Sequence, residues 1–316
     1  MTVRAVAPPS SADLDAAWAV VGERLAPTPL VPAPALGDDV HLKLETLQPT
    51  GSFKVRGALA ALSRTGGGPV VTASAGNAGL GIAWAATALG VDATVVVAET
   101  ASPAKVAALE ALPVTLIRHG AGYDEAEGHA LALAEDEMTY VSSYNDTGVI
   151  AGQSTIGREL DVQLPGPLTV ASPVGGGSLS SGLGLWAAGR ADARVVALEA
   201  ERSPAFSTAL AAGEITPVEV RDTLADGLAG NIEPGAITFE LVRDNVAAVA
   251  SVTEPEIEEA IRLLARAHGI VAEGAGAAAV AGLMAGRVER GPGALVVVVT
   301  GRNIALGRLA VVLGRA

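Results

Sequence analysis

The chain has 316 residues, half of them apolar and only 3% aromatic, and a formal charge of −13 at pH 7. Its length fits one large α/β domain or two smaller ones, of which we favour two, and its many alanines and glycines suit helices packed closely on parallel sheets. The acidic field, with no basic run to offset it, argues against nucleic acid and anionic membranes as partners. The absence of cysteine excludes disulfides and thiolate chemistry.

The sequence shows no targeting or membrane-spanning segment. Residues 1–10 contain no apolar signal core, and no apolar run reaches the ~18 residues that a membrane span requires. We therefore expect a soluble protein of the cytoplasm with no membrane partner.

Strand-like and helix-like segments alternate along the first half of the chain. Apolar segments predict strands at 41–45, 69–73, 93–98 and 114–118. The segments between and after them predict helices at 53–64, 75–89, 103–112 and 123–137. Such βα alternation is typical of a parallel sheet.

The second half continues this pattern. We expect strands at 168–172, 194–199 and 294–300, and helices at 148–160, 179–190, 254–268 and 275–286. Thr253, followed by an acid and a proline, marks the start of the helix 254–268. The strands are almost continuously apolar, which indicates sheets covered on both faces, with ligands at the carboxyl ends of the strands.

Lys54 is the residue that most invites a chemical interpretation. Only three of the 21 basic residues are lysines, and this one lies in the segment 50–58 beside Phe53, between a Gly-Ser turn and an Arg-Gly pair. A primary amine is what forms a Schiff base with a carbonyl substrate or with pyridoxal phosphate (PLP). The alternative is an ordinary lysine at a helix start, with Ser52 as the helix cap.

Two loops that follow strands and open helices are candidates for anion binding. Ser74, Ala75, Gly76 and Asn77 would present free backbone N–H groups to a carboxylate or phosphate, unless Ser74 or Asn77 merely caps the helix. The segment 175–178 holds three glycines and a serine but no basic residue. It fits a phosphate held by amides and a helix dipole, with a flexible turn as the alternative.

Two further strand-end or helix-start positions carry weaker signals. Thr300 ends the most apolar strand and could direct a hydroxyl into a site, and Glu273 is either a ligand-facing carboxylate or an acid at a helix start. The four histidines show no metal-ligand spacing, and no Gly-x-Ser-x-Gly motif of a serine hydrolase is present.

Taken in order, these segments resemble the fold-type II PLP enzymes, and most closely the threonine/serine dehydratase (ammonia-lyase) family. The likeness also includes the segments 149–157, 226–229 and 271–277, and so covers nearly the whole chain. It implies a tryptophan synthase β-like α/β fold of two domains, each a mostly parallel twisted sheet flanked by helices. The larger, PLP-binding domain would comprise residues 1–67 and 147–316, and a smaller mobile substrate domain residues 68–146.

The resemblance also implies roles for individual residues. Lys54 would carry PLP through a Schiff base and later remove the Cα proton, with Ser52 as a second catalytic residue. PLP would be held by Phe53, Lys54, Asn77, Gly175, Gly176, Gly177, Ser178 and Thr300. The substrate would be held by Ser52, Ser74, Ala75, Gly76 and Asn77.

The implied reaction converts L-threonine and/or L-serine to a 2-oxo acid and ammonia by β-elimination of water. Thr300 would face the pyridine nitrogen, and a neutral hydroxyl there makes the ring a weaker electron sink than an aspartate would, which favours expulsion of a β leaving group. The family implies a homodimer or a higher homo-oligomer.

The sequence departs from the family pattern in three respects. Ala78 stands where dehydratases usually have histidine and leans towards the threonine synthase and cysteine synthase branches, so a β-replacing synthase stays open, as does a non-catalytic binding protein. Ala75 replaces the serine of the racemases, which disfavours racemisation. Near Glu199, Ser203 and Ala205 stand where a second acidic ligand is expected, so we predict no metal.

Overall fold

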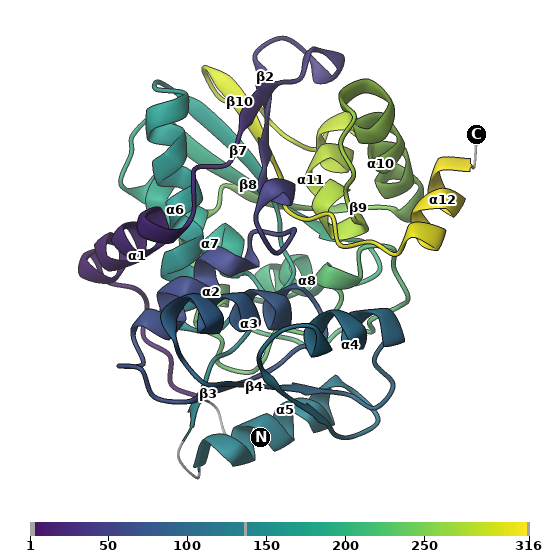
Figure 1. Ribbon diagram of the computed structural model, residues 1–316. Coiled ribbons are helices and arrows are strands. Elements are labelled where there is room, and N and C mark those ends of the chain that lie inside the picture. Colours follow the sequence, from purple (N-terminus) through teal and green to yellow (C-terminus); the bar gives the residue numbers. More distant parts are fainter. Residues whose placement is uncertain (1–3, 136–137, 315–316) are drawn as a thin grey trace.

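The computed structural model describes residues 4–135 and 138–314, which form two mostly parallel sheets with helices packed on them (Figure 1). The larger sheet has six strands in the order β1-β2-β10-β7-β8-β9. Only β1 runs antiparallel to its neighbour, and the other adjacent pairs are parallel. The strands are β1 (Leu30–Pro32), β2 (Val40–Leu44), β7 (Leu168–Pro173), β8 (Ala193–Ala200), β9 (Ala248–Val252) and β10 (Ala294–Val299).

The central strand β10 shows how the larger sheet builds two cores. Its alternate residues Leu295, Val297 and Val299 pack with α10 (Glu254–His268) and α11 (Gly274–Met284). Val296 and Val298 face the other way, towards α6 (Thr147–Gln163) and α7 (Ser178–Ala188). Successive side chains of a strand point to opposite faces of the sheet, and both faces of β10 are buried. A continuous apolar run is therefore needed here.

The smaller sheet has four parallel strands in the order β5-β4-β3-β6. Its strands are β3 (Val70–Ala73), β4 (Ala93–Val97), β5 (Thr115–Arg118) and β6 (Thr139–Tyr140). On one face, α5 (Tyr123–Glu135) packs against alternate residues of β3 and β4. The other face is covered by α2 (Lys54–Ser63), α3 (Asn77–Leu89) and α4 (Pro103–Glu110).

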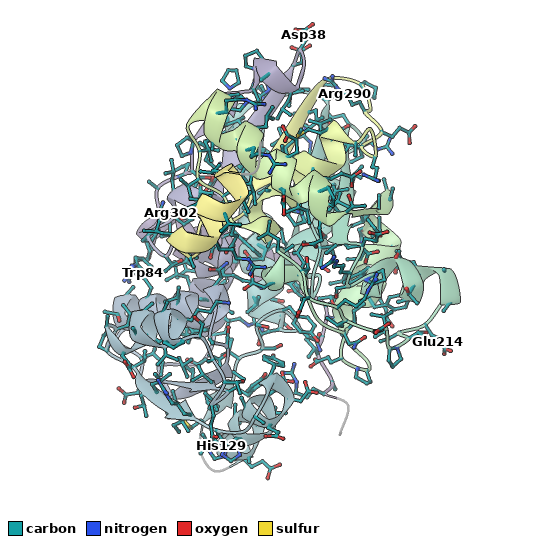
Figure 2. All side chains as sticks on the ribbon, turned by 90° about the vertical axis from the view of Figure 1, so that its right-hand side faces the viewer. Asp38, Trp84, His129, Glu214, Arg290 and Arg302 are labelled. Carbon is teal, nitrogen blue, oxygen red and sulfur yellow. The ribbon has the colours of Figure 1, made fainter. Side chains whose placement is uncertain are left out.

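The two sheets lie towards opposite ends of the molecule. In Figure 2, Trp84 of α3 and His129 of α5 mark the end with the smaller sheet, and Asp38 and Arg290 mark the other end. The remaining elements are α1 (Ser11–Arg24), α8 (Ala205–Ala212), α9 (Ile237–Asn245), α12 (Leu306–Gly314), η1 (Pro34–Leu36), η2 (Glu45–Leu47) and η3 (Asp226–Leu228). None of the helices in the described ranges is both long and apolar enough to cross a membrane.

Each strand and helix expected from the sequence is present, with ends that differ by at most a few residues. Positions 136 and 137 of one expected helix lie outside the described residues. The sequence did not indicate β1, β6 or β9, because these are short or only half-buried strands without a continuous apolar run. The strands of the smaller sheet all fall inside the segment 68–146, and the domain boundaries themselves stay a prediction.

Candidate active site

Lys54 is the first residue of α2, and its side chain is half-buried. Its Nζ donates a hydrogen bond to the carbonyl oxygen of Ser143 at 2.8 Å and stands 5.1 Å from the centre of the Phe53 ring. Within the described chain no carboxylate forms an ion pair with it. Burial therefore lowers the pKa of Lys54 to about 8, which leaves part of the amine neutral near pH 7.

Backbone hydrogen bonds to the end of β10 hold the segment before Lys54. The N–H of Phe53 donates to the carbonyl of Thr300 at 3.0 Å, and Ser52 forms a bridge with Gly301. Ser52 is fully buried, and its Oγ has no hydrogen-bond partner in the part of the chain that is described. The alternative that Ser52 caps α2 is wrong, because this helix has no side-chain cap.

The glycine loop 175–177 connects β7 to α7 and is enclosed tightly. A Cβ on Gly176 would lie 2.3 Å from the Tyr144 ring, and one on Gly177 would lie 2.6 Å from Phe206. Gly177 also has a φ of +96°, which favours glycine. None of the N–H groups of residues 175–178 donates to another described protein group. A phosphate at the start of α7 would satisfy them.

Asn77, the first residue of α3, forms hydrogen bonds with Glu273 and Asn303, which lie in segments around the larger sheet. Its Nδ2 donates to Glu273 Oε1 at 2.7 Å, and its Oδ1 accepts from Asn303 Nδ2 at 2.7 Å. Asn303 Nδ2 also reaches the carbonyl of Thr50 at 2.8 Å. Burial raises the pKa of Glu273 to about 7, opposed by the hydrogen bond from Asn77. Glu273 therefore directs its carboxyl group towards the site.

The loop that precedes α3 brings the expected substrate-binding residues next to Asn77. Ser74 Oγ accepts the N–H of Gly76 at 3.2 Å, so it stabilises the turn and does not cap the helix. Further along α3, a Cβ on Gly81 would lie 3.1 Å from the backbone carbonyl of Lys54. This glycine lets α3 approach the start of α2, which places the loop beside the lysine.

The connection between β6 and α6 supplies site residues that sequence reasoning missed. Ser143 accepts the Lys54 amine through its backbone, and the Tyr144 ring lies on the glycine loop. The hydroxyl of Tyr144 accepts the N–H of Glu233 at 2.9 Å, and the carboxylate of Glu233 binds Asn145 Nδ2. The sequence carries no signal for these residues, because the short strand β6 that precedes them was itself not indicated.

The remaining expected positions are also accounted for. Thr300 is buried at the end of β10, and its Oγ1 donates to the carbonyl of Ala275 at 3.4 Å. Glu199 accepts the N–H of Phe206 at 3.0 Å and the hydroxyl of Ser251 at 3.0 Å. Its carboxylate thus accepts hydrogen bonds from backbone N–H groups in the first turn of α8.

The arrangement fits PLP: an amine without a counter-ion stands beside a loop with free N–H groups at a helix start. A family model described as pyridoxal-phosphate dependent enzyme matches residues 22–301, and the chain belongs to this family. The predicted family, fold class and cofactor are thereby confirmed.

Individual relatives point in one direction. The chain is 40% identical over 276 residues to the L-threonine ammonia-lyase of Thermotoga maritima, covering 85% of this chain and 68% of that protein. It is 34% identical over 287 residues to the L-threonine dehydratase catabolic TdcB of Escherichia coli K12, covering 87% of this chain and 86% of that protein.

Solved structures of a threonine deaminase and of a serine racemase share this fold. Threonine deaminase isoform 2 from Solanum lycopersicum, in its processed form, superposes with a TM-score of 0.88 at 29% identity, covering 100% of this chain and 97% of that one. Maize serine racemase superposes with a TM-score of 0.89 at 26% identity, covering 96% of each chain.

Proposed function

We propose that the protein is a PLP-dependent ammonia-lyase that converts L-threonine to a 2-oxo acid and ammonia, with L-serine as a second substrate. The observation that carries the proposal is the half-buried Lys54 amine, which has no counter-ion among the described residues and lies 2.8 Å from the Ser143 carbonyl oxygen. A lysine whose pKa is about 8 can act as a base near neutral pH. The names of the relatives support threonine as the substrate.

Bound PLP supplies the electron-withdrawing ring that acidifies the Cα–H bond of an amino acid attached to it. The N–H groups of residues 175–178 would hold its phosphate, and Phe53 and Asn77 would hold its ring. Lys54 would hold the cofactor, and its Nζ would take the Cα proton of the substrate. Ser52 assists at this step.

The residues around the substrate favour elimination of the β-hydroxyl as water. Ser74, Ala75, Gly76 and Asn77 bind the carboxylate at the start of α3. Ala75 offers no proton at the opposite face of Cα, which disfavours racemisation. Thr300 is neutral, which would favour departure of the β-hydroxyl. The hydroxyl would leave as water with a proton equivalent to the one that Lys54 takes from Cα. The released enamine takes up water and yields the 2-oxo acid and ammonia.

The proposal is tested with purified protein reconstituted with PLP. We expect an absorbance band at the edge of the visible range and release of 2-oxo acid from threonine, and Lys54→Ala should lose both. Lys105→Ala is the matched control, because Lys105 is exposed and paired with Asp226. A band that survives in Lys54→Ala would show that another lysine carries the cofactor.

Two other outcomes would point to the alternatives. If added sulfide suppresses 2-oxo acid release and a sulfur amino acid accumulates, the protein is a β-replacing synthase, as Ala78 would allow. If no cofactor band forms at all, the protein binds ligands without this chemistry.

We also propose that the protein assembles as a homodimer or a higher homo-oligomer in the cytoplasm, as expected from the sequence. Sedimentation velocity tests the assembly, and a monomer at micromolar concentration would contradict it. Fractionation of the source cells tests the location.

A further inference from the structure

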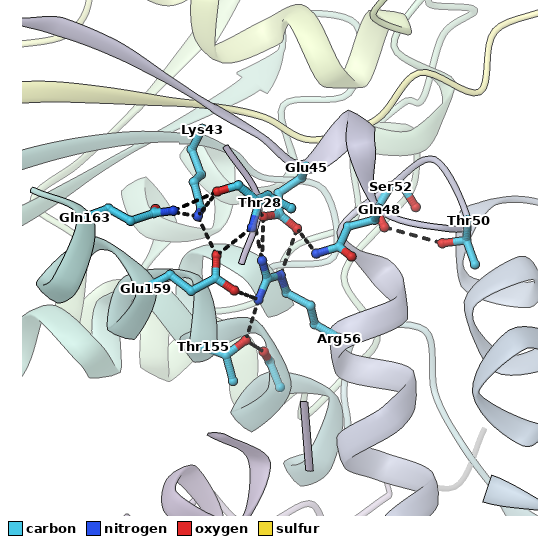
Figure 3. A network of polar contacts seen from close by, with 11 residues as sticks. Thr28, Lys43, Glu45, Gln48, Thr50, Ser52, Arg56, Thr155, Glu159 and Gln163 are labelled. Atoms are coloured by element: carbon cyan, nitrogen blue, oxygen red, sulfur yellow. Dashed lines mark hydrogen bonds and ion pairs between the residues drawn. The ribbon is translucent and has the colours of Figure 1, made fainter. Parts of the chain in front are cut away.

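A buried cluster of four charged side chains lies behind the start of α2 (Figure 3). We call it the α2 ion cluster; its members are Lys43, Glu45, Arg56 and Glu159, each at most 4% exposed. Lys43 pairs with Glu159, and Arg56 pairs with both Glu45 and Glu159. Two cations and two carboxylates thus compensate one another where water is absent.

Arg56 is the centre of this cluster because its guanidinium spans both carboxylates. Nε and Nη2 each donate to one oxygen of Glu45 at 2.8 Å. Nη1 donates to Glu159 at 2.6 Å and to Thr155 Oγ1 at 3.2 Å. Burial acts to lower the pKa of Arg56, but the two carboxylates outweigh it and raise the pKa. A planar fork with several donors is needed for this geometry, which lysine cannot reproduce.

The partners of Arg56 come from different elements, which the guanidinium joins. Glu45 begins η2, whose chain leads through Gln48 to the segment before Lys54, and Gln48 Nε2 donates to Glu45 at 3.2 Å. Glu159 belongs to α6, which packs on α2 so closely that a Cβ on Gly152 would lie 2.4 Å from the Arg56 carbonyl. The cluster therefore fixes α2 against both the strand β2 and the helix α6.

The start of α2 depends on such tertiary contacts because it has no side-chain cap. An uncapped helix start frays readily, and Lys54 is the first residue of this one. Arg56 lies in the same helical turn, two residues further on. The ion pairs of Arg56 hold this turn against Glu45 and Glu159. The hydrogen bond from the Phe53 N–H to the Thr300 carbonyl holds it against the end of β10.

We propose that Arg56 is a positioning residue, which holds the first turn of α2 so that the Lys54 amine stays at the Ser143 carbonyl and away from water. This inference rests on the proposed function only in that Lys54 is taken as the reacting amine. Because the α2 ion cluster has no net charge, it anchors the helix without placing an uncompensated carboxylate near Lys54. Without the Arg56 guanidinium, water can enter the start of α2, and a carboxylate of Glu45 or Glu159 loses its partner. Each of these effects raises the pKa of Lys54.

The test compares Arg56→Lys with Arg262→Lys, the same substitution on α10, where Arg262 donates to Glu259 at 2.9 Å. Cofactor-free protein is treated with formaldehyde and cyanoborohydride over a pH series that brackets the Lys54 midpoint. Peptide mass spectrometry with fragmentation then follows methylation of Lys54 separately from Lys43, Lys105 and the lysine introduced by each substitution. We expect the midpoint for Lys54 to rise by about one pH unit or more in Arg56→Lys, and to stay unchanged in Arg262→Lys.

A second readout uses the PLP-loaded protein. We expect kcat for threonine to fall about tenfold in Arg56→Lys with little change in KM, since the reacting amine is misplaced while the substrate loop is intact. Thr155→Val removes one bond to Arg56 without changing charge, and should shift both readouts in the same direction by less. This milder variant decides the matter if Arg56→Lys does not fold.

One outcome would overturn the positioning role of Arg56, and another would separate that role from the proposed ammonia-lyase function. If the variants lose stability while the Lys54 midpoint and kcat match those of Arg262→Lys, Arg56 is only structural. If wild-type protein releases no 2-oxo acid but the Lys54 midpoint still shifts in Arg56→Lys, the positioning role stands and the proposed function fails.

Discussion

Two regions on either side of α2 withdraw charged groups from water in opposite ways. In the α2 ion cluster, Lys43 and Arg56 are matched by Glu45 and Glu159. In the candidate active site, Lys54 forms no ion pair with a carboxylate of the described residues, and the Glu273 carboxyl group accepts a hydrogen bond from the Asn77 amide. There, burial lowers the pKa of Lys54 to about 8 and raises that of Glu273 to about 7. Between Arg56 and Glu45 the partners outweigh burial, so the pKa of Arg56 is raised and that of Glu45 is lowered, whereas burial still lowers the pKa of Lys43.

The comparison separates charges that maintain the fold from charges kept ready to react. A buried ion is tolerated when its partner stays in place, and removal of one partner leaves the other uncompensated. A buried group without a counter-ion lowers stability, and such groups persist where they have a chemical role. Mutations in the two regions should therefore change stability with opposite sign.

The largest effect is expected from Glu159→Ala. It leaves Lys43 and Arg56 with a single carboxylate between them, and should lower the free energy of unfolding by about 3–5 kcal/mol. Urea unfolding followed by circular dichroism measures this. Glu289→Ala is the control, because its partner Arg194 lies 3.4 Å away at the exposed surface. A loss below about 1 kcal/mol would end the distinction between the two regions.

The opposite sign is expected for Lys54→Met. The pKa of Lys54 falls from its ordinary 10.5 to about 8 on folding, so the folded state binds the proton more weakly. The cost is present below pH 8 and disappears as the pH rises to 10.5. Lys54→Met should therefore stabilise cofactor-free protein by about 3 kcal/mol near neutral pH and by little once the pH exceeds the ordinary pKa of lysine.

Glu273→Gln tests the acidic side of the same argument. The pKa of Glu273 rises from 4.5 to about 7 on folding, so the folded state keeps the proton more strongly. Its favourable contribution is full below pH 4.5 and is lost as the pH rises through 7. Glu273→Gln should be nearly neutral in the acidic range and stabilising by about 2–3 kcal/mol at about pH 8. A difference independent of pH would contradict the assigned burial.

The smallest effect on stability is expected at the exposed ion pair between Lys105 of α4 and Asp226 of η3. Lys105 of α4 lies 2.8 Å from Asp226 of η3, and both side chains are more than 40% exposed. Lys105→Ala should change stability by less than about 1 kcal/mol but raise KM for threonine about twofold at low salt. Asp226→Asn should match it, and about 0.5 M salt, well above physiological ionic strength, should abolish the effect. If neither variant changes KM, the ion pair between Lys105 and Asp226 does not contribute to substrate binding.

The sequence was sufficient for features that are local. Continuous valine runs predicted the parallel strands, and the glycine loop and the Lys54 segment predicted an amine beside a phosphate site. It was insufficient where function lies in the backbone or in pairing over distance. The Ser143 carbonyl has no signature in the side chain, and Lys43, Arg56 and Glu159 look like ordinary charges until the fold brings them together.

The position of β10 has a consequence for how the chain acquires its structure during synthesis. This strand lies between β2 and β7, yet it is formed by residues 294–299, near the end of the chain. Strands β3 to β6 lie within residues 70–140 and can pair while later residues are still being added. Until β10 emerges, β2 and β7 each present an unpaired apolar edge. A chain cut before residue 294 would therefore be prone to aggregation and could not serve as a smaller enzyme.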